Sequence, residues 1–207
     1  MKHEYRKHEK ELYGTKTTPV LLEVGTQRYL CVKGEGNPNT AAFRERVEVL
    51  YSLAYAIRMM PKTGFTPPGY FEYTVYPLEG LWDLNEIGRQ SQEFDKNHLV
   101  YTLMIRQPNF VDDAIITRAF AHVRKKKPQP LLDDVFISDS SDGLVVQLLH
   151  LGSYDDEPAS FAKMKAFIAE NNLEIKSLVH REIYLSDPRK TAPEKLKTLL
   201  RYCVEKR

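Results

Sequence analysis

Several kinds of site lack their characteristic residues in this sequence of 207 amino acids. The two cysteines, Cys31 and Cys203, lie in apolar strand-like segments without the spacing of a metal pair, so we expect free, buried thiols. The six histidines show no His-Glu-x-x-His or related spacing, and His150, in an apolar strand, is expected to be a satisfied core residue. A phosphate-binding Gly-x-x-x-x-Gly-Lys loop, a dinucleotide-binding glycine fingerprint and a Gly-x-Ser-x-Gly nucleophile motif are also missing. We therefore expect no metal and no cofactor.

Charge and hydropathy argue against further classes of protein. Lys and Arg number 30 against 28 Asp and Glu, a formal net charge of +2, which does not indicate a nucleic-acid-binding protein. No apolar run approaches the ~20 residues that a membrane-spanning helix needs. Residues 1–11 are densely charged and lack the apolar core of a signal peptide. We expect a cytoplasmic protein, monomeric or homodimeric, with no nucleic-acid or membrane partner.

The apolar residues that are present outline the secondary structure by their periodicity. Of all residues 42% are hydrophobic and 11% aromatic, as in ordinary globular proteins. Alternation and short apolar runs predict strands, whereas apolar positions three and four apart predict helices. The predicted strands cover 29–33, 69–76, 99–106, 144–151, 178–187 and 198–204, with a short apolar piece at 134–137, and the predicted helices cover 41–60, 111–124 and 158–170.

The predicted elements occur in the same order twice. A strand, a turn, a helix led by Phe43 and two further strands recur later as a strand, a turn, a helix led by Phe161 and two strands. A βαββ unit cannot bury its sheet and helix faces alone, so we expect two pseudo-symmetric repeats, 27–107 and 143–207, that pair with each other. Residues 1–26 then form an N-terminal arm, and residues 108–142 form an inserted helix and loop.

The predicted strand over 178–187 carries an unusual pair of polar side chains. Its apolar residues go to one face, and Glu182 and Tyr184 go to the other. A solvated sheet face explains this pattern without any function. In the register of the repeat, however, Tyr184 corresponds to Tyr76 and Glu182 to Thr74. Tyrosines and a carboxylate would then approach each other in a cleft between the two halves, where ligand sites often lie.

Several ordered segments carry a family resemblance. They are Gly34-Glu35-Gly36-Asn37-Pro38-Asn39-Thr40, Pro77-Leu78-Glu79-Gly80-Leu81-Trp82, Ile105-Arg106-Gln107-Pro108 and His180-Arg181-Glu182-Ile183-Tyr184-Leu185-Ser186-Asp187-Pro188, together with the charged arm. Over nearly the whole chain they resemble the GyrI-like small-molecule-binding family, in its stand-alone bacterial branch. The resemblance implies an α+β fold in which the two βαββ repeats form an antiparallel sheet, with helices on one face and a ligand groove on the other. Residues 27–207 would then be a single GyrI-like domain.

The resemblance also implies a function. Relatives of this domain serve as effector-binding domains of multidrug-responsive transcription regulators or inhibit gyrase, and stand-alone members have been assigned as hydrolases of cyclopropane-bearing cytotoxins. The family's central glutamate corresponds to Glu182, and its tryptophan after Leu-Glu-Gly corresponds to Trp82. Two positions depart from the family pattern. Asp83 stands where relatives often carry a second aromatic residue, and Tyr101 stands where a tryptophan is expected, so the shape of the groove differs accordingly.

A groove with these residues suits hydrophobic, planar or cationic small molecules, because aromatic rings stack on a flat ligand and a buried carboxylate offsets its charge. The expected ligand-binding residues are Tyr55, Tyr76, Glu79, Trp82, Tyr101 and Tyr154. For an electrophilic cyclopropane, Glu182 is the candidate general base, and Tyr184, Tyr76 or Tyr154 is the candidate hydrogen-bond donor to the developing oxyanion. A detoxifying hydrolase is one hypothesis. A non-catalytic drug-binding, sequestering or effector-sensing protein is the alternative.

Overall fold

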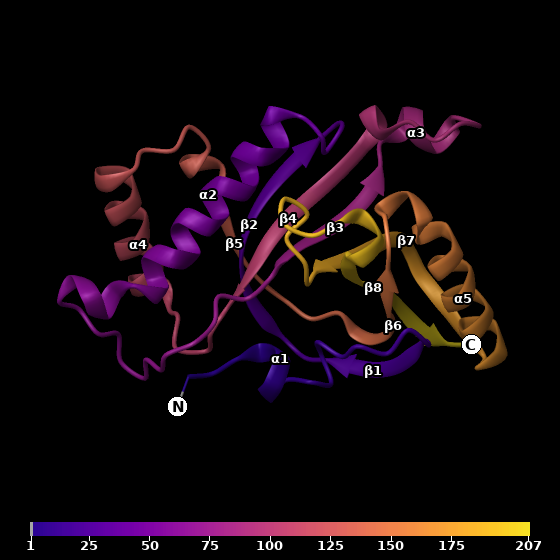
Figure 1. Ribbon diagram of the computed structural model, residues 1–207, viewed down its shortest axis with the longest axis horizontal. Helices are drawn as coiled ribbons and strands as arrows, with labels where there is room; N and C mark the ends of the chain where they lie inside the picture. The colour runs from indigo at the N-terminus through magenta and orange to yellow at the C-terminus, as the bar shows by residue number, and fades with distance from the viewer. Residues whose placement is uncertain (1) are drawn as a thin grey trace. The chain divides into compact units, whose positions relative to one another are not determined.

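The computed structural model of the protein describes residues 2–207, which fall into two compact units of mixed helix and strand (Figure 1). Unit 1 comprises residues 2–4, 27–78 and 84–140, and unit 2 comprises Tyr5–Thr26, Glu79–Asp83 and Ser141–Arg207. The strands within each unit pair in antiparallel fashion. The predicted α+β class with antiparallel strands is confirmed. Among the described residues, none of the helices combines the length and the apolar character needed to cross a membrane.

Unit 1 is a three-stranded sheet with helix α2 packed against it and α4 packed against α2. The strand order is β4-β2-β5, and Cys31 of β2 stands opposite both Met104 of β4 and Phe136 of β5. Figure 1 shows α2 running along β2 and β4, with α4 beside it. The bounds are β2 Gln27–Glu35, α2 Ala41–Arg58, α3 Glu86–Gln90, β4 Leu99–Gln107, α4 Asp113–Lys126 and β5 Phe136–Ser140.

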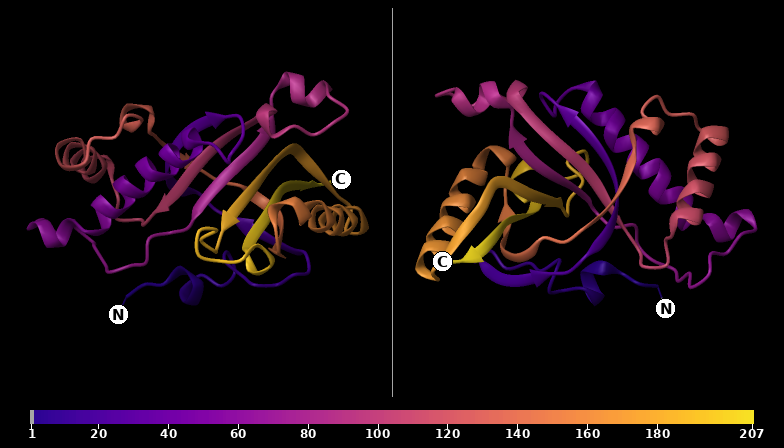
Figure 2. Two further views of the ribbon diagram at one scale, coloured as in Figure 1. Left: turned by 45° about the horizontal axis from the view of Figure 1, so that its top comes forward. Right: turned by 180° about the vertical axis from the view of Figure 1, so that it is seen from behind.

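Unit 2 is a five-stranded sheet with one long helix, α5, on one face. The strand order is β1-β6-β8-β7-β3. Helix α5 contacts β6, β7 and β8, and Figure 2 shows it running alongside these strands. The bounds are α1 Tyr5–His8, β1 Val20–Val24, β3 Leu78–Leu84, β6 Gly143–Leu151, α5 Glu157–Glu170, β7 Leu173–Tyr184 and β8 Lys197–Lys206.

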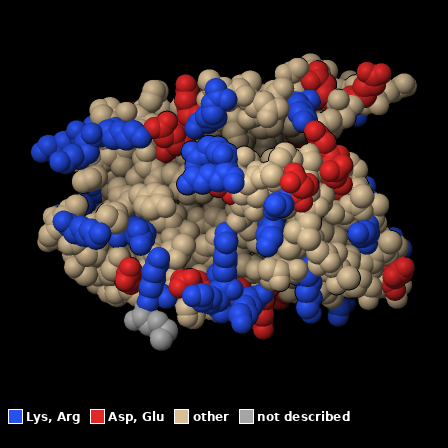
Figure 3. All heavy atoms as spheres, in the orientation of Figure 1, with Lys and Arg blue, Asp and Glu red and all other residues tan. Residues whose placement is uncertain are grey.

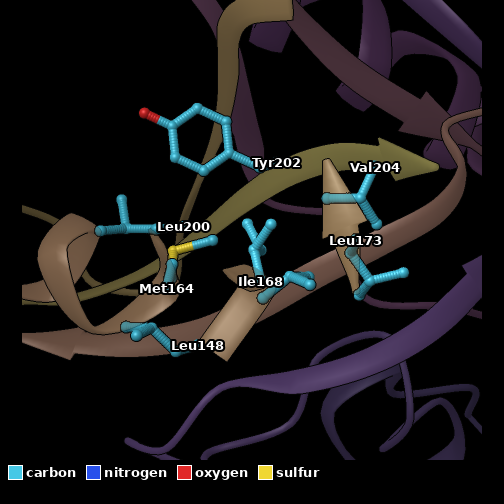
Figure 4. Packing of buried hydrophobic residues seen from close by; sticks show 8 residues of the cluster. Leu148, Met164, Ile168, Leu173, Leu200, Tyr202 and Val204 are labelled. Atoms are coloured by element: carbon cyan, nitrogen blue, oxygen red, sulfur yellow. The ribbon is translucent and has the colours of Figure 1, made fainter. Parts of the chain in front are cut away.

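The core of unit 2 lies between α5 and the sheet. Met164 and Ile168, four residues apart on α5, pack with Leu148 of β6 and with Leu200 and Tyr202 of β8 (Figure 4). Apolar residues at this spacing form one stripe on a helix, and the stripe is buried only if the helix lies along the sheet. We call the sheet face that carries Leu148, Leu200 and Tyr202 the helix-covered face of unit 2.

An irregularity in β7 changes which of its residues point toward α5. Ile175 pairs with Val204 of β8, but the next paired residue, His180, stands opposite Tyr202, so the register shifts between them. In an unbroken strand Ile175 and His180 would face opposite sides of the sheet, because side chains alternate. Here their partners Val204 and Tyr202 both belong to the core beneath α5. The irregularity therefore brings His180 and every second residue after it onto the helix-covered face.

Most of the predicted elements are confirmed, with shifted ends. The predicted helices correspond to α2, α4 and α5, and the predicted strands over 29–33, 99–106, 144–151 and 198–204 correspond to β2, β4, β6 and β8. The strand predicted over 178–187 is β7, which begins earlier, at Leu173, and ends at Tyr184. The predicted arm contains an additional strand, β1, which pairs with β6, and the short apolar piece at 134–137 leads into β5.

The predicted strand over 69–76 is wrong. Within the described part of the chain, this segment makes a single isolated bridge, between His3 and Tyr73. Pro77 follows it and has no backbone N–H to donate to a ladder. The aromatic alternation reflects packing rather than strand pairing, because the rings of Tyr73 and Tyr76 are buried and lie 6.5 Å apart.

Strand β3 takes the place of that predicted strand and changes the expected register. β3 begins at Leu78, so it contains the Leu-Glu-Gly-Leu-Trp segment itself, and it pairs with β7. Gly80 stands opposite Glu182, and Trp82 stands opposite His180. The repeat register predicted that Tyr76 corresponds to Tyr184. Tyr76 lies before β3, so the strand that pairs with β7 does not contain it.

We predict that Met164→Ala destabilises the protein by about 2–5 kcal/mol, because it leaves a cavity between α5 and the sheet. Met164 has no exposed surface, whereas Lys165, the next residue, is exposed. Urea unfolding followed by far-ultraviolet circular dichroism measures the change, with Lys165→Ala as the control. Equal stabilities of the two variants would contradict the packing of α5 described here.

Candidate functional site

Glu182 is a buried carboxylate on the helix-covered face of unit 2. It stands on β7 between Gly80 of β3 and Leu200 of β8, and 8% of its surface is exposed. Burying a carboxylate is costly unless hydrogen-bond donors replace the water that it loses. The surroundings of Glu182 provide such donors to both of its oxygens.

Trp82 and Tyr184 form a hydrogen-bond chain that ends on Glu182. Nε1–H of Trp82 donates to the hydroxyl oxygen of Tyr184 over 2.8 Å, and the hydroxyl of Tyr184 donates to Oε2 of Glu182 over 2.8 Å. An indole N–H can only donate and a carboxylate can only accept, so the direction of this chain is fixed. The proton of Tyr184 is therefore directed at Glu182.

Gly80 makes room for the indole of Trp82. A Cβ atom at position 80 would lie 2.5 Å from Nε1 and 3.2 Å from Cε2 of the indole. Because the ring is rigid, any side chain at this position would displace the N–H that reaches Tyr184. The glycine of the Leu-Glu-Gly-Leu-Trp segment is thus explained by the close approach of the tryptophan two residues later.

His180 supplies a donor to the second oxygen of Glu182. Its Nε2 lies 3.0 Å from Oε1, and since a carboxylate only accepts, Nε2 carries the hydrogen. The imidazole lies edge-on to Phe161 of α5, with 4.8 Å between ring centroids, and 6.1 Å from the ring of Tyr202. Packing between these rings holds His180 in the orientation that reaches the carboxylate.

Glu157, the first residue of α5, brings a second carboxyl group to Glu182. Its side chain is 6% exposed and hydrogen-bonds that of Glu182. Burial, followed by the negative charge of Glu182, raises the pKa of Glu157 to about 9. Its Oε1 has no hydrogen-bond partner among residues 2–207. Both causes favour the protonated form of Glu157.

Tyr154 is the most exposed member of the group. It begins the short helix η4 (Tyr154–Asp156), which leads into α5, and its ring lies edge-on to that of Tyr184 at 6.0 Å. Burial and the charge of Glu182 raise the pKa of Tyr154 to about 12, and the same two causes raise the pKa of Tyr184 well above its ordinary value. Both phenols are therefore neutral and able to donate.

We call these six residues the candidate site: Trp82, Tyr154, Glu157, His180, Glu182 and Tyr184. They lie on the face that α5 covers, near the first turn of the helix, whereas the sequence predicted a ligand groove on the face away from the helices. The site holds two carboxyl groups and several aromatic rings. Such a set can bind a planar or cationic molecule and can accept a proton.

A shallow hollow of about 740 Å³ lies beyond the end of β7 and does not include Glu182. Its lining contains Leu185 and both charge signs, and Figure 3 shows Lys and Arg side chains gathered around α1 and the loop between β7 and β8. The charged residues of the lining are Arg6, Asp187, Lys190, Glu194, Lys195 and Lys197. This hollow and the candidate site therefore have no lining residue in common.

Glu79 lies on the opposite face of the unit 2 sheet, in a buried ion-pair network. Its Oε2 accepts from Nη1 of Arg181 at 2.7 Å, and Nη2 of Arg181 donates to Asp142 at 2.6 Å. Arg201 donates to Asp142 at 3.1 Å and to Gln147 at 2.6 Å. The charges of the two guanidinium groups balance those of the two carboxylates. Glu79 is only 1% exposed, and its carboxylate pairs with Arg181.

Three predicted ligand-binding tyrosines belong to unit 1. Tyr55 is 48% exposed on α2. Tyr76 is buried with the guanidinium of Arg106 4.5 Å from its ring centroid, and Tyr101 is buried with its ring 5.3 Å from that of Phe43. The structure brings Trp82, Tyr154, Glu182 and Tyr184 together, and the ligand-binding roles of the three unit 1 tyrosines and of Glu79 stay predictions.

Sequence reasoning missed two members of the candidate site. His180 stands two residues before Glu182, so strand alternation alone could have placed it on the same face. Glu157 precedes Pro158, where the predicted helix began, and no sequence pattern connects a helix start with a distant strand. His150, in contrast, is buried with both ring nitrogens hydrogen-bonded, to Ser160 and to the carbonyl of Ser153, as predicted.

We predict that Gly80→Ala breaks the hydrogen bond from Trp82 to Tyr184, because the new methyl group would lie only 2.5 Å from Nε1 and force the indole to move. Trp82 is the only tryptophan, so its fluorescence spectrum reports directly on the change. Gly25→Ala is the matched control, since a Cβ there meets nothing within 4 Å. An unchanged emission spectrum in Gly80→Ala would show that the indole does not depend on this glycine.

We also predict that Glu79→Gln destabilises the protein by about 3 kcal/mol, because it removes one charge from a buried, balanced network. Binding of a cationic dye to the folded variant should be unchanged, since the Glu79 carboxylate already pairs with Arg181. Denaturant unfolding and dye titration measure the two effects, with the exposed Glu194→Gln as the control. A loss of dye affinity without a loss of stability would show that Glu79 binds the ligand and does not stabilise the fold.

This chain is similar to several solved structures, including the following three. A hydrolase encoded by lin2189 from Listeria innocua is 34% identical, with a TM-score of 0.91. An uncharacterised conserved protein from the same species is 35% identical, with a TM-score of 0.89, and both matches cover 99% of this chain and 100% of the other chain. The EcmrR C-terminal domain is 11% identical with a TM-score of 0.55, covering 92% of this chain and 98% of that domain, and it shares the fold.

Among curated proteins, none matches this chain. Residues 17–204 match the family described as the GyrI-like small molecule binding domain. This match extends from the residues before β1 into the last strand, β8, so it includes every residue of the candidate site. The chain belongs to the GyrI-like family of small-molecule-binding domains.

Proposed function

We propose that this protein binds hydrophobic, planar or cationic small molecules at the candidate site and hydrolyses electrophilic cyclopropane-type cytotoxins there. The observation that carries the proposal is the buried carboxylate of Glu182, oriented by Tyr184 and His180 among aromatic rings. The 34% identical hydrolase from Listeria innocua supports turnover rather than binding alone. Membership of a small-molecule-binding family supports the class of ligand.

The charge and the rings of the candidate site suit a flat cation. Among residues 2–207, Glu182 has no guanidinium or ammonium partner of the kind that Arg181 is for Glu79. Its donors, Tyr184 and His180, orient the carboxylate through hydrogen bonds. A ligand cation would pair with this carboxylate, while Tyr154 and Trp82 offer aromatic faces and edges for stacking.

The same carboxylate can act as the base in ring opening. Water attacks the cyclopropane carbon, a ring C–C bond breaks, and the electron pair moves to the conjugated carbonyl oxygen. Glu182 accepts the proton of the attacking water. Tyr184 orients this base, because its own proton is already directed at Oε2 of Glu182. Tyr154, neutral and 37% exposed, is the donor that meets the oxygen of the ligand.

The alternative function is binding without turnover, as in a sequestering or effector-sensing protein. One observation favours it: in this structure both oxygens of Glu182 already accept hydrogen bonds, from Tyr184 and His180. A carboxylate held in this way is a good counter-ion and would need to give up or share a donor to reach a water molecule. The two functions use the same site and differ in whether a product is released.

We predict that Glu182→Gln lowers the rate of ring opening by about 10²–10⁴-fold, because it removes the general base. The substrate is a spirocyclopropyl cyclohexadienone, and mass spectrometry follows the product that has gained one water. Binding of the cationic dye rhodamine 6G, measured by fluorescence anisotropy, should weaken in the same variant but remain measurable. Glu170→Gln, an exposed position at the far end of α5, is the control.

The outcomes separate the two functions. Ring-opened product that depends on Glu182 supports the hydrolase. A stoichiometric, unreacted complex of wild-type protein with the cyclopropane compound supports the binding protein. Unchanged turnover in Glu182→Gln would remove Glu182 from the mechanism.

A further inference from the structure

Two carboxyl groups, those of Glu157 and Glu182, meet in the candidate site. The side chain of Glu157 hydrogen-bonds that of Glu182, and its other oxygen, Oε1, finds no partner within the described chain. The titratable groups around Glu157 are Tyr154 and Asp155 of η4 and Glu182 and Tyr184 of β7. None of these four groups is a base, and the one base of the candidate site, His180, hydrogen-bonds Glu182 at Oε1.

A hydrogen bond between two carboxyl groups requires a proton on one of them, since two carboxylates are both acceptors. The donors decide which group carries it. Glu182 accepts from Tyr184 on Oε2 and from His180 on Oε1, and these hydrogen bonds stabilise a charged carboxylate. Glu157 accepts from no donor at Oε1, is 6% exposed and would be a desolvated charge if it were ionised.

We infer that Glu157 and Glu182 form a carboxyl pair that shares one proton, held on Glu157, and that the pair therefore carries a single negative charge. Glu157 is a positioning residue, because it acts on ligands through Glu182. A pair with one proton matches a ligand with one positive charge. It also presents Glu182 with three donors, from Tyr184, His180 and Glu157, that fix its plane.

The shared proton also balances the proposed ring opening, and this step rests on the proposed function. The pair begins with one proton and gains a second when Glu182 accepts it from the attacking water. One proton then passes to the oxygen that was the carbonyl of the substrate, and the pair returns to its resting state. The substrate gains one water in total, and no oxidant or reductant takes part.

Protein stability tests the pair without any ligand. The folded protein keeps the Glu157 proton up to about pH 9, whereas an unfolded chain releases it near the ordinary value of 4.5, so wild-type stability falls as pH rises between these values. Gln mimics the protonated acid and has no proton to release. We expect the unfolding constant of wild type, relative to Glu157→Gln, to increase about tenfold per pH unit between pH 6 and pH 8.

The control for this experiment is Glu170→Gln, at the exposed end of the same helix, where we expect no pH-dependent difference. Packing alone would give a difference between wild type and Glu157→Gln that does not change with pH, and that result would overturn the proposal. If Glu157→Gln fails to fold, Glu157→Ala in the same urea titration provides the second comparison, with the same pH slope expected and a constant offset from the lost packing.

Infrared spectroscopy tests the position of the proton directly. At pH 7 the difference spectrum of wild type minus Glu157→Gln should contain the C=O stretch of a protonated carboxyl group, which moves in D₂O and disappears as pH rises through about 9. A carboxylate signal at pH 7 would overturn the proposal. These readouts need neither dye nor substrate, so a protein that proves not to hydrolyse cyclopropanes can still confirm or refute the pair.

Discussion

The register shift of β7 between Ile175 and His180 is the constraint on which the chemistry of unit 2 depends. Without it, the alternation that points Ile175 at α5 would turn Glu182 toward the opposite face of the sheet. With it, Glu182 lies beneath the first turn of α5, where Glu157 and the aromatic residues can reach it. A local irregularity in one strand thus decides which side chains share a site.

The buried carboxylates on the two faces of the unit 2 sheet have different partners. On one face, Glu79 belongs to a closed network of two guanidinium groups and two carboxylates, which is electrically balanced. On the helix-covered face, Glu182 accepts hydrogen bonds from Tyr184 and His180, and a second carboxyl group stands beside it. Because a buried carboxylate without a guanidinium or ammonium partner is costly, we place the proposed ligand on the helix-covered face.

Much of this could be predicted from local pattern. Alternation along 178–187 placed Glu182 and Tyr184 on one face, and helical spacing located α2, α4 and α5. The prediction was wrong for 69–76, where aromatic alternation arises from packing around His3 rather than from strand pairing. Glu157 could not be predicted, because its role depends on contact with a strand that follows it in the sequence.

The sequence by itself determined the fold class and the family, because both depend on periodicity or on ordered motifs along the chain, and it predicted Glu182 as the central residue of the site. The tertiary structure alone decided the contact between Glu157 and Glu182, the direction of the Trp82–Tyr184–Glu182 hydrogen-bond chain and the ion pair of Glu79 with Arg181. Burial and hydrogen-bond geometry set these properties. They arise only when residues distant in sequence are brought within about 3 Å of one another.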